Sequence, residues 1–162
     1  EPLESTSIHL IQDGIAKLIS HFPNRNFDPV NIEAYNRRMR FDYERIRDFI
    51  ILHYHLNQRD DSEFWKACAH MQIPDTLQHK IDLFKATGRV LRIDGELFSE
   101  VGWLQVMEGQ NLQAQHYHPL VDLQSEESIH EYLESVRQVI VKCVDVMPEH
   151  QAFIAQNCAA PR

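Results

Sequence analysis

Apolar residues recur every three or four positions along most of this chain, which is the spacing that builds one apolar face of an α-helix. The first such run follows three consecutive hydroxyl residues, Ser5, Thr6 and Ser7. These residues predict a helix start at which a side-chain oxygen accepts from the first-turn amides. The apolar positions of this first helix are Ile8, Ile11, Ile15, Leu18, Ile19 and Phe22.

A long second helix is predicted from Asp28-Pro29, where an N-cap precedes a proline in the first turn, to about Asn57. The positions expected to face the core are Ile32, Tyr35, Met39, Tyr43, Ile46 and Ile50. The opposite face is expected to be solvated, and it carries Arg37, Arg38, Glu44 and Arg45.

Shorter helices should follow. Asp61 or Ser62 begins one that runs through Met71, and Asp75 begins another that stops at Gly88. Core positions of the latter are Leu77, Ile81 and Phe84. The alternating residues 90–93 and the tight-turn pair Asp94-Gly95 allow at most a small β-hairpin near residues 90–98, after which Ser99 caps a helix to about Met107.

The last long helix starts at Ser125 or Ser128, where Ser128 and Glu131 fit a capping box. Its apolar stripe consists of Ile129, Leu133, Val136, Ile140 and Val144. Pro148 ends it, and the tail beyond is expected to be a frayed turn. With no repeat or low-complexity linker, the pattern predicts a mainly α fold in which residues 1–162 form a single helical region.

Length, charge and composition exclude several classes of function. A chain of 162 residues can bury one core, and a net charge of −8 with dispersed Lys and Arg excludes a nucleic-acid surface. No apolar run is long enough to cross a membrane. The three unevenly spaced cysteines, Cys68, Cys143 and Cys158, fit reduced thiols of a cytoplasmic protein.

Histidine is frequent, but its spacing does not indicate a metal site. His53 and His55 are two positions apart, whereas two helical ligands need to be about four apart to share a face. His116 and His118 have no evident third ligand. Packing or surface roles account for these residues, and no metal is expected.

Several short motifs occur in a fixed order along the first half of the chain. They are Pro2-Leu3-Glu4-Ser5-Thr6, His21-Phe22-Pro23, Phe27-Asp28-Pro29, Arg47-Asp48-Phe49, His53-Tyr54 and Arg59-Asp60-Asp61-Ser62-Glu63-Phe64-Trp65. Together they resemble the flavin-dependent tryptophan halogenases. The resemblance implies that this chain is the C-terminal region of such an enzyme, with the FAD-binding domain and catalytic lysine upstream. The chain alone is then expected to be inactive, and no Gly-rich phosphate loop for a dinucleotide occurs in it.

In that family, reduced FAD, oxygen and chloride or bromide give hypohalous acid, which halogenates an aromatic small molecule, here tryptophan, indole or a derivative. A flavin reductase supplies the reduced FAD. The resemblance assigns Glu4 as the catalytic glutamate, Ser5 as the residue whose carbonyl accepts the indole N–H, Thr6 and Ser7 as the halide site, and Ile8 as a flavin contact. Helix N-termini do bind anions, so Glu4 must face away from the halide, toward the substrate.

Two departures from the family pattern affect halide and substrate. Ser7 stands where well-studied members carry glycine, which leaves the choice between chloride and bromide open. The stretch 95–107 is shorter than the family's and lacks the tyrosine pair that encloses free tryptophan. Phe98 and Trp103 are the aromatic residues there that can stack on a substrate, although such residues at helical spacing are more often core.

Two alternatives remain open at this point. One is a flavin-dependent aromatic monooxygenase, which shares the flavin and oxygen chemistry but hydroxylates. The other is a non-catalytic helical capping or interaction module, in which Glu4 only caps a helix. A homodimer is compatible with either interpretation.

Overall fold

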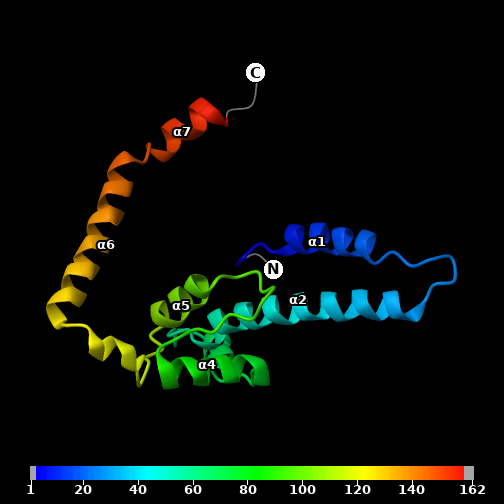
Figure 1. Cartoon of the computed structure of the whole chain (residues 1–162), viewed down its shortest axis with the longest axis horizontal. Helices are drawn as coiled ribbons and strands as arrows, with labels where there is room; N and C mark the ends of the chain where they lie inside the picture. The colour runs from blue at the N-terminus through cyan, green and yellow to red at the C-terminus, as the bar shows by residue number, and fades with distance from the viewer. Residues whose placement is uncertain (1–2, 159–162) are drawn as a thin grey trace. The chain divides into compact units, whose positions relative to one another are not determined.

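The computed structural model describes residues 3–158, and Figure 1 shows its helices in chain order. The chain divides into two compact units, one ending at His118 and one beginning at Pro119. Residues 3–158 contain helices and loops without a β-strand. The predicted mainly α fold is therefore confirmed.

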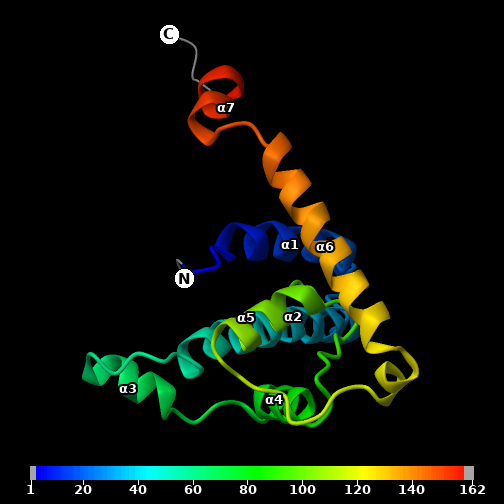
Figure 2. The same cartoon turned by 90° about the vertical axis from the view of Figure 1, so that its left-hand side faces the viewer.

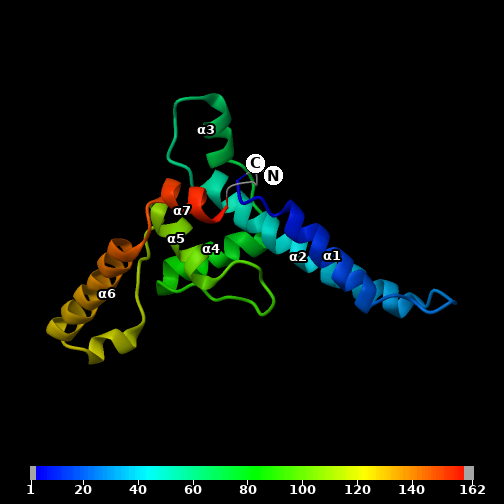
Figure 3. The same ribbon diagram turned by 90° about the horizontal axis from the view of Figure 1, so that it is seen from above.

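The first unit is built around one long helix. Its helices are α1 (Ser7–Ser20), α2 (Pro29–His55), α3 (Glu63–Ala69), α4 (Asp75–Thr87) and α5 (Glu100–Gly109). Helix α2 contacts each of the other four. Helices α1 and α2 run side by side, and Figures 2 and 3 show α3 standing apart from α4 along the end of α2.

The core of this unit lies where α2, α4 and α5 meet. Its buried side chains are Phe49, Leu52, Leu77, Ile81, Phe84, Trp103 and Met107. The predicted core face of α4 is therefore confirmed. Phe49 links α2 to α5 and to the loop before it, because its ring stacks on Phe98 at 3.8 Å and meets Trp103 edge-on at 4.8 Å between ring centroids.

The predicted faces of α2 are only partly correct. All its buried residues lie in its C-terminal half, whereas Ile32 and Tyr43 are exposed. Arg45, expected in solvent, is only 8% exposed. Its guanidinium is paired with buried Asp48 at 3.3 Å, which compensates for its burial.

Asp48 joins α2 to the first turn of α4. Besides pairing with Arg45, its carboxylate accepts a hydrogen bond from the Arg47 guanidinium at 2.7 Å and another from the Thr76 hydroxyl at 2.5 Å. Arg47 and Asp48 thus form an ion pair between neighbouring positions of α2. Because Asp48 is buried and accepts from several donors, it fixes the packing of α4 on α2.

The small hairpin that the sequence allowed near residues 90–98 does not form, although its turn is present. Asp94-Gly95 turns the chain, with the Glu96 amide donating to the Ile93 carbonyl at 3.1 Å. No strands pair there, because Glu96 points inward instead. Its carboxylate binds the ammonium of Lys80 on α4 at 3.0 Å, and both side chains are buried.

His55, near the end of α2, makes the stability of this unit depend on pH. Burial lowers the pKa of His55 below 6.5, Lys85 and His70 lower it further, and a hydrogen bond to the Cys68 backbone opposes them. The unfolded chain therefore takes up the proton more readily, and stability falls as the pH drops below 6.5. We expect His55→Gln to reduce the loss in melting temperature between about pH 7 and pH 5. Equal losses in both proteins would contradict this.

The second unit contains the 3-10 helix η1 (Pro119–Leu123), α6 (Glu126–Val146) and α7 (His150–Asn157). Ser125 caps α6, because its hydroxyl accepts from the Ser128 amide at 3.2 Å. The tail is not a frayed turn: α7 forms after Pro148, and the Glu149 carboxylate accepts from the Ala152 amide at 2.9 Å. That acidic cap was missed in the sequence.

Within residues 3–158, no helix is long and apolar enough to cross a membrane. In the same part of the chain, no three His, Cys, Asp or Glu side chains gather closely enough to hold a metal ion. Cys68, Cys143 and Cys158 are free thiols.

Candidate active site

The segment that carries the predicted site turns sharply before α1. Ser5 has a φ of +53°, a left-handed conformation that is uncommon for residues other than glycine. Thr6 occupies the N-cap position and is buried, but its side chain makes no capping hydrogen bond. The predicted side-chain cap is therefore wrong. The first-turn amides of α1 are left without that cap, which suits an anion.

Glu4 lies on the other side of this turn, against α2. Its Oε1 is 3.3 Å from Nε2 of His53. The other ring nitrogen of His53 is 2.9 Å from the Phe49 carbonyl, one helical turn back. The structure thus brings Glu4 to a residue 49 positions away to which the sequence analysis gave only a packing or surface role.

A cavity of about 400 Å³ opens beside this pair. Its lining consists of Leu3, His53, Tyr54, Asn57, Gln58, Arg59, Trp65, Gly109 and Gln110. The rings of Tyr54 and Trp65 stack with centroids 5.9 Å apart, and the Arg59 guanidinium lies 4.7 Å from the centre of the Trp65 ring. Such walls suit a planar aromatic ligand.

The two aromatic residues predicted to bind substrate lie elsewhere. Trp103 is 1% exposed in the core and offers no ring face to a ligand, so the core alternative accounts for it. Phe98 is half-buried and stacks on Phe49. Neither lines the cavity beside His53. The residues missed there, Tyr54 and Trp65, belong to motifs noted in the sequence, whereas only the fold shows that they share a cavity.

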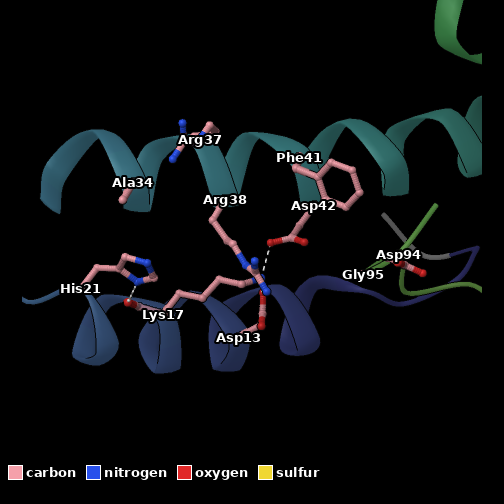
Figure 4. Close-up of a pocket in the computed structure, with 10 residues that line it drawn as sticks. All are labelled: Asp13, Lys17, His21, Ala34, Arg37, Arg38, Phe41, Asp42, Asp94 and Gly95. Atoms are coloured by element: carbon pink, nitrogen blue, oxygen red, sulfur yellow. Dashed lines mark hydrogen bonds and ion pairs between the residues drawn. The ribbon is translucent and has the colours of Figure 1, made fainter. Parts of the chain in front are cut away.

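Helix α1 presents the remaining predicted residues outward. Ser7 is exposed, and Ile8 is 69% exposed at the start of an apolar face that is open along the whole helix. The opposite face is held on α2 by Lys17, which pairs with Asp13 and Asp42 (Figure 4).

Burial alone lowers the pKa of Lys17, but hydrogen bonds and attraction from the two carboxylates outweigh it and raise the pKa. A raised lysine pKa means that the pairing stabilises the folded state at neutral pH. That contribution is lost only as the pH rises above 10.5. The Lys17 contribution to holding α1 on α2 is thus retained at neutral pH.

A family model described as tryptophan halogenase matches residues 1–126. The chain belongs to the tryptophan halogenase family. Among solved structures it is similar to Xcc4156, a flavin-dependent halogenase from Xanthomonas campestris, with 45% identity and a TM-score of 0.91. It is also similar to BrvH, a flavin-dependent halogenase from Brevundimonas sp. BAL3, with 41% identity and a TM-score of 0.89.

These alignments cover 99% and 96% of this chain but 32% of each halogenase. Tryptophan 7-halogenase KtzQ from Kutzneria sp. (strain 744) is 37% identical over 86 residues, which are 53% of this chain and 16% of KtzQ. The chain thus spans about a third of the solved halogenases that it matches. Its helices are a family feature, since they superpose on both solved halogenases over nearly their whole length.

Proposed function

We propose that this chain is the C-terminal part of an FAD-dependent halogenase that chlorinates or brominates an indole-type aromatic compound. The observation that carries the proposal is that Glu4, in the family motif, contacts His53, which lines an aromatic-walled cavity. The N-terminal FAD-binding domain of the same protein and a flavin reductase are the partners that this function requires.

Glu4 acts as the general base in this proposal. Electrophilic halogenation of an arene gives a cationic ring that must lose a proton, and a carboxylate next to the ring can accept it. The Glu4 side chain is 30% exposed, so it is accessible to a ligand without being fully hydrated. Leu3 and His53, on either side of Glu4, both line the cavity.

The start of α1 fits the halide and flavin sites. Its first-turn amides lack a side-chain cap, and exposed Ile8 follows them. In the proposed enzyme the amides of Thr6 and Ser7 hold chloride or bromide, and Ile8 touches the flavin. When bound, reduced FAD would supply the two electrons that reduce one atom of O2 to water, while the other oxygen atom oxidises the halide to hypohalous acid. The Ser5 carbonyl accepts the substrate N–H.

The substrate is proposed to be indole or a substituted indole rather than free tryptophan. The tyrosine pair that would clamp the amino-acid group is missing from residues 95–107, and the cavity beside His53 is apolar over most of its wall. An indole ring needs stacking surfaces and one N–H acceptor, which Tyr54, Trp65 and the Ser5 carbonyl can supply.

The test is an assay of the complete protein with FAD, a flavin reductase, NADH and either halide, offering indole and tryptophan side by side. We expect halogenated indole and at least about tenfold less halogenated tryptophan, because the clamp is missing. Efficient halogenation of tryptophan would contradict the substrate proposal. Hydroxylated product would favour the monooxygenase alternative, and no reaction with any arene would favour the non-catalytic module.

A further inference from the structure

His53 is held in one orientation. A backbone carbonyl only accepts hydrogen bonds, so the 2.9 Å contact with the Phe49 carbonyl requires the proton on Nδ1. The ring also packs edge-on against Phe49, with centroids 4.9 Å apart and an interplanar angle of 83°. Both contacts aim Nε2 at Glu4.

The contact between Nε2 of His53 and the Glu4 carboxylate is an ion pair when the imidazole is protonated. With Nδ1 protonated, the Nε2 of a neutral ring bears a lone pair, which repels a carboxylate oxygen at 3.3 Å. A proton on Nε2 turns the same contact into a charge-assisted ion pair. The charged groups at this end of α2 include Arg59, which lines the same cavity.

We propose that His53 is the positioning residue for Glu4: it binds Oε1 from Nε2 and so orients the carboxylate that receives the proton of the substrate. This inference rests on the proposed function. Glu4 belongs to a turn with a left-handed residue, whereas His53 is one helical turn from Phe49 in the core. His53 therefore ties a carboxylate on a loop to the most rigid part of the unit, and rigid placement is what a general base requires.

If His53 served only packing, its Nε2 contact with Glu4 would be unnecessary. The edge-on contact with Phe49 is satisfied by any ring of the same shape. Only a residue with a donor at the position of Nε2 can also hold Glu4. The two roles are therefore separated by substitutions that keep the ring and remove the donor, or that keep the donor and remove the ring.

Four variants of the complete enzyme make this separation. His53→Phe keeps the ring, and His53→Gln keeps a donor near the Nε2 position. His53→Asn keeps a donor only near Nδ1, and it also serves if the phenylalanine variant fails to fold. His79→Phe, at an exposed position on α4, is the matched control. The assay measures kcat and KM for halogenation of indole, together with FAD binding and the melting temperature.

We expect His53→Phe and His53→Asn to lower kcat about 10- to 100-fold while KM and FAD binding change less than about threefold. His53→Gln should restore kcat to within about threefold of the wild type. Because His53 acts through Glu4, His53→Phe combined with Glu4→Gln should be no slower than Glu4→Gln alone. His79→Phe should match the wild type.

The result that overturns the inference is a kcat of His53→Phe or His53→Asn equal to that of the wild type. A further loss when His53→Phe is added to Glu4→Gln would also overturn it, since the two residues would then act independently. Halogenated indole from the wild type, lost in Glu4→Gln, shows that the proposed function stands in either case. Without product from the wild type, the proposed function fails first and the inference with it.

Discussion

Replacing Glu4 with glutamine in the complete enzyme is expected to lower kcat for halogenation by about 10²- to 10⁴-fold, the range typical of a lost general base. Glutamine has nearly the same size and can still contact His53, but it cannot accept a proton from the cationic ring. FAD binding should be unchanged, because the proposed flavin contact begins at Ile8 and the first turn of α1. Product formation by liquid chromatography and FAD binding by fluorescence measure the two effects.

The control for this substitution is Glu63→Gln on α3. The Glu63 side chain is 93% exposed, and its ion-pair partner is Lys66, an exposed residue of the same helix. The Glu63→Gln enzyme should halogenate at the rate of the wild type. Undiminished turnover in Glu4→Gln would remove Glu4 from the mechanism, whereas loss of FAD binding in that variant would show a structural role instead.

Where local chemistry determines the structure, the sequence was sufficient. Asp28, Ser62 and Ser99 each accept a hydrogen bond from a first-turn amide, as their residue types predict. Gly88 ends α4 with a φ of +66°, and a Cβ there would approach the His116 carbonyl oxygen to 2.9 Å. Caps and stops depend on residues within a few positions, so they can be recognised without the fold.

Buried charges could not be predicted in this way. Periodicity assigns charged residues to the solvent, and it therefore placed Arg45 on the surface and missed the inward turn of Glu96. Each is buried because a partner from another turn or another helix compensates its charge. Such partners are identified only when the helices are packed, and the same pairing is why residues 90–98 form a loop in place of a hairpin.

In the candidate site, too, the features set by nearby residues could be predicted, whereas those set by tertiary packing could not. The family motif located Glu4 and the start of α1, but it gave no reason to join them to His53, Tyr54 and Trp65. Sequence reasoning placed the aromatic wall at Phe98 and Trp103, which pack on Phe49. The cavity arises because the end of α2, the loop after it and the end of α5 converge beside residue 4, and that convergence is a property of the tertiary structure.

The second large effect is expected on stability. Replacing Glu96 with alanine leaves the ammonium of Lys80 buried without its carboxylate, and breaking a buried pair in this way costs about 3–5 kcal/mol. The Lys80 Nζ also lies 4.3 Å from the centre of the buried Trp103 ring and 3.3 Å from the Leu91 carbonyl oxygen. Its ammonium is therefore enclosed by protein atoms and poorly hydrated. The melting temperature should fall by roughly 6–20 °C, as measured by circular dichroism.

The double variant Lys80→Met with Glu96→Leu distinguishes the loss of the ion pair from the cost of leaving one buried charge without a partner. Because both charges are removed together and apolar side chains of similar volume replace them, its melting temperature should lie well above that of Glu96→Ala. Glu63→Ala, which breaks an exposed pair on α3, should leave the melting temperature unchanged. If the Glu96→Ala variant has the melting temperature of the wild type, the Lys80 ammonium must reach water in that variant. The ion pair then does not hold residues 90–98 against α4.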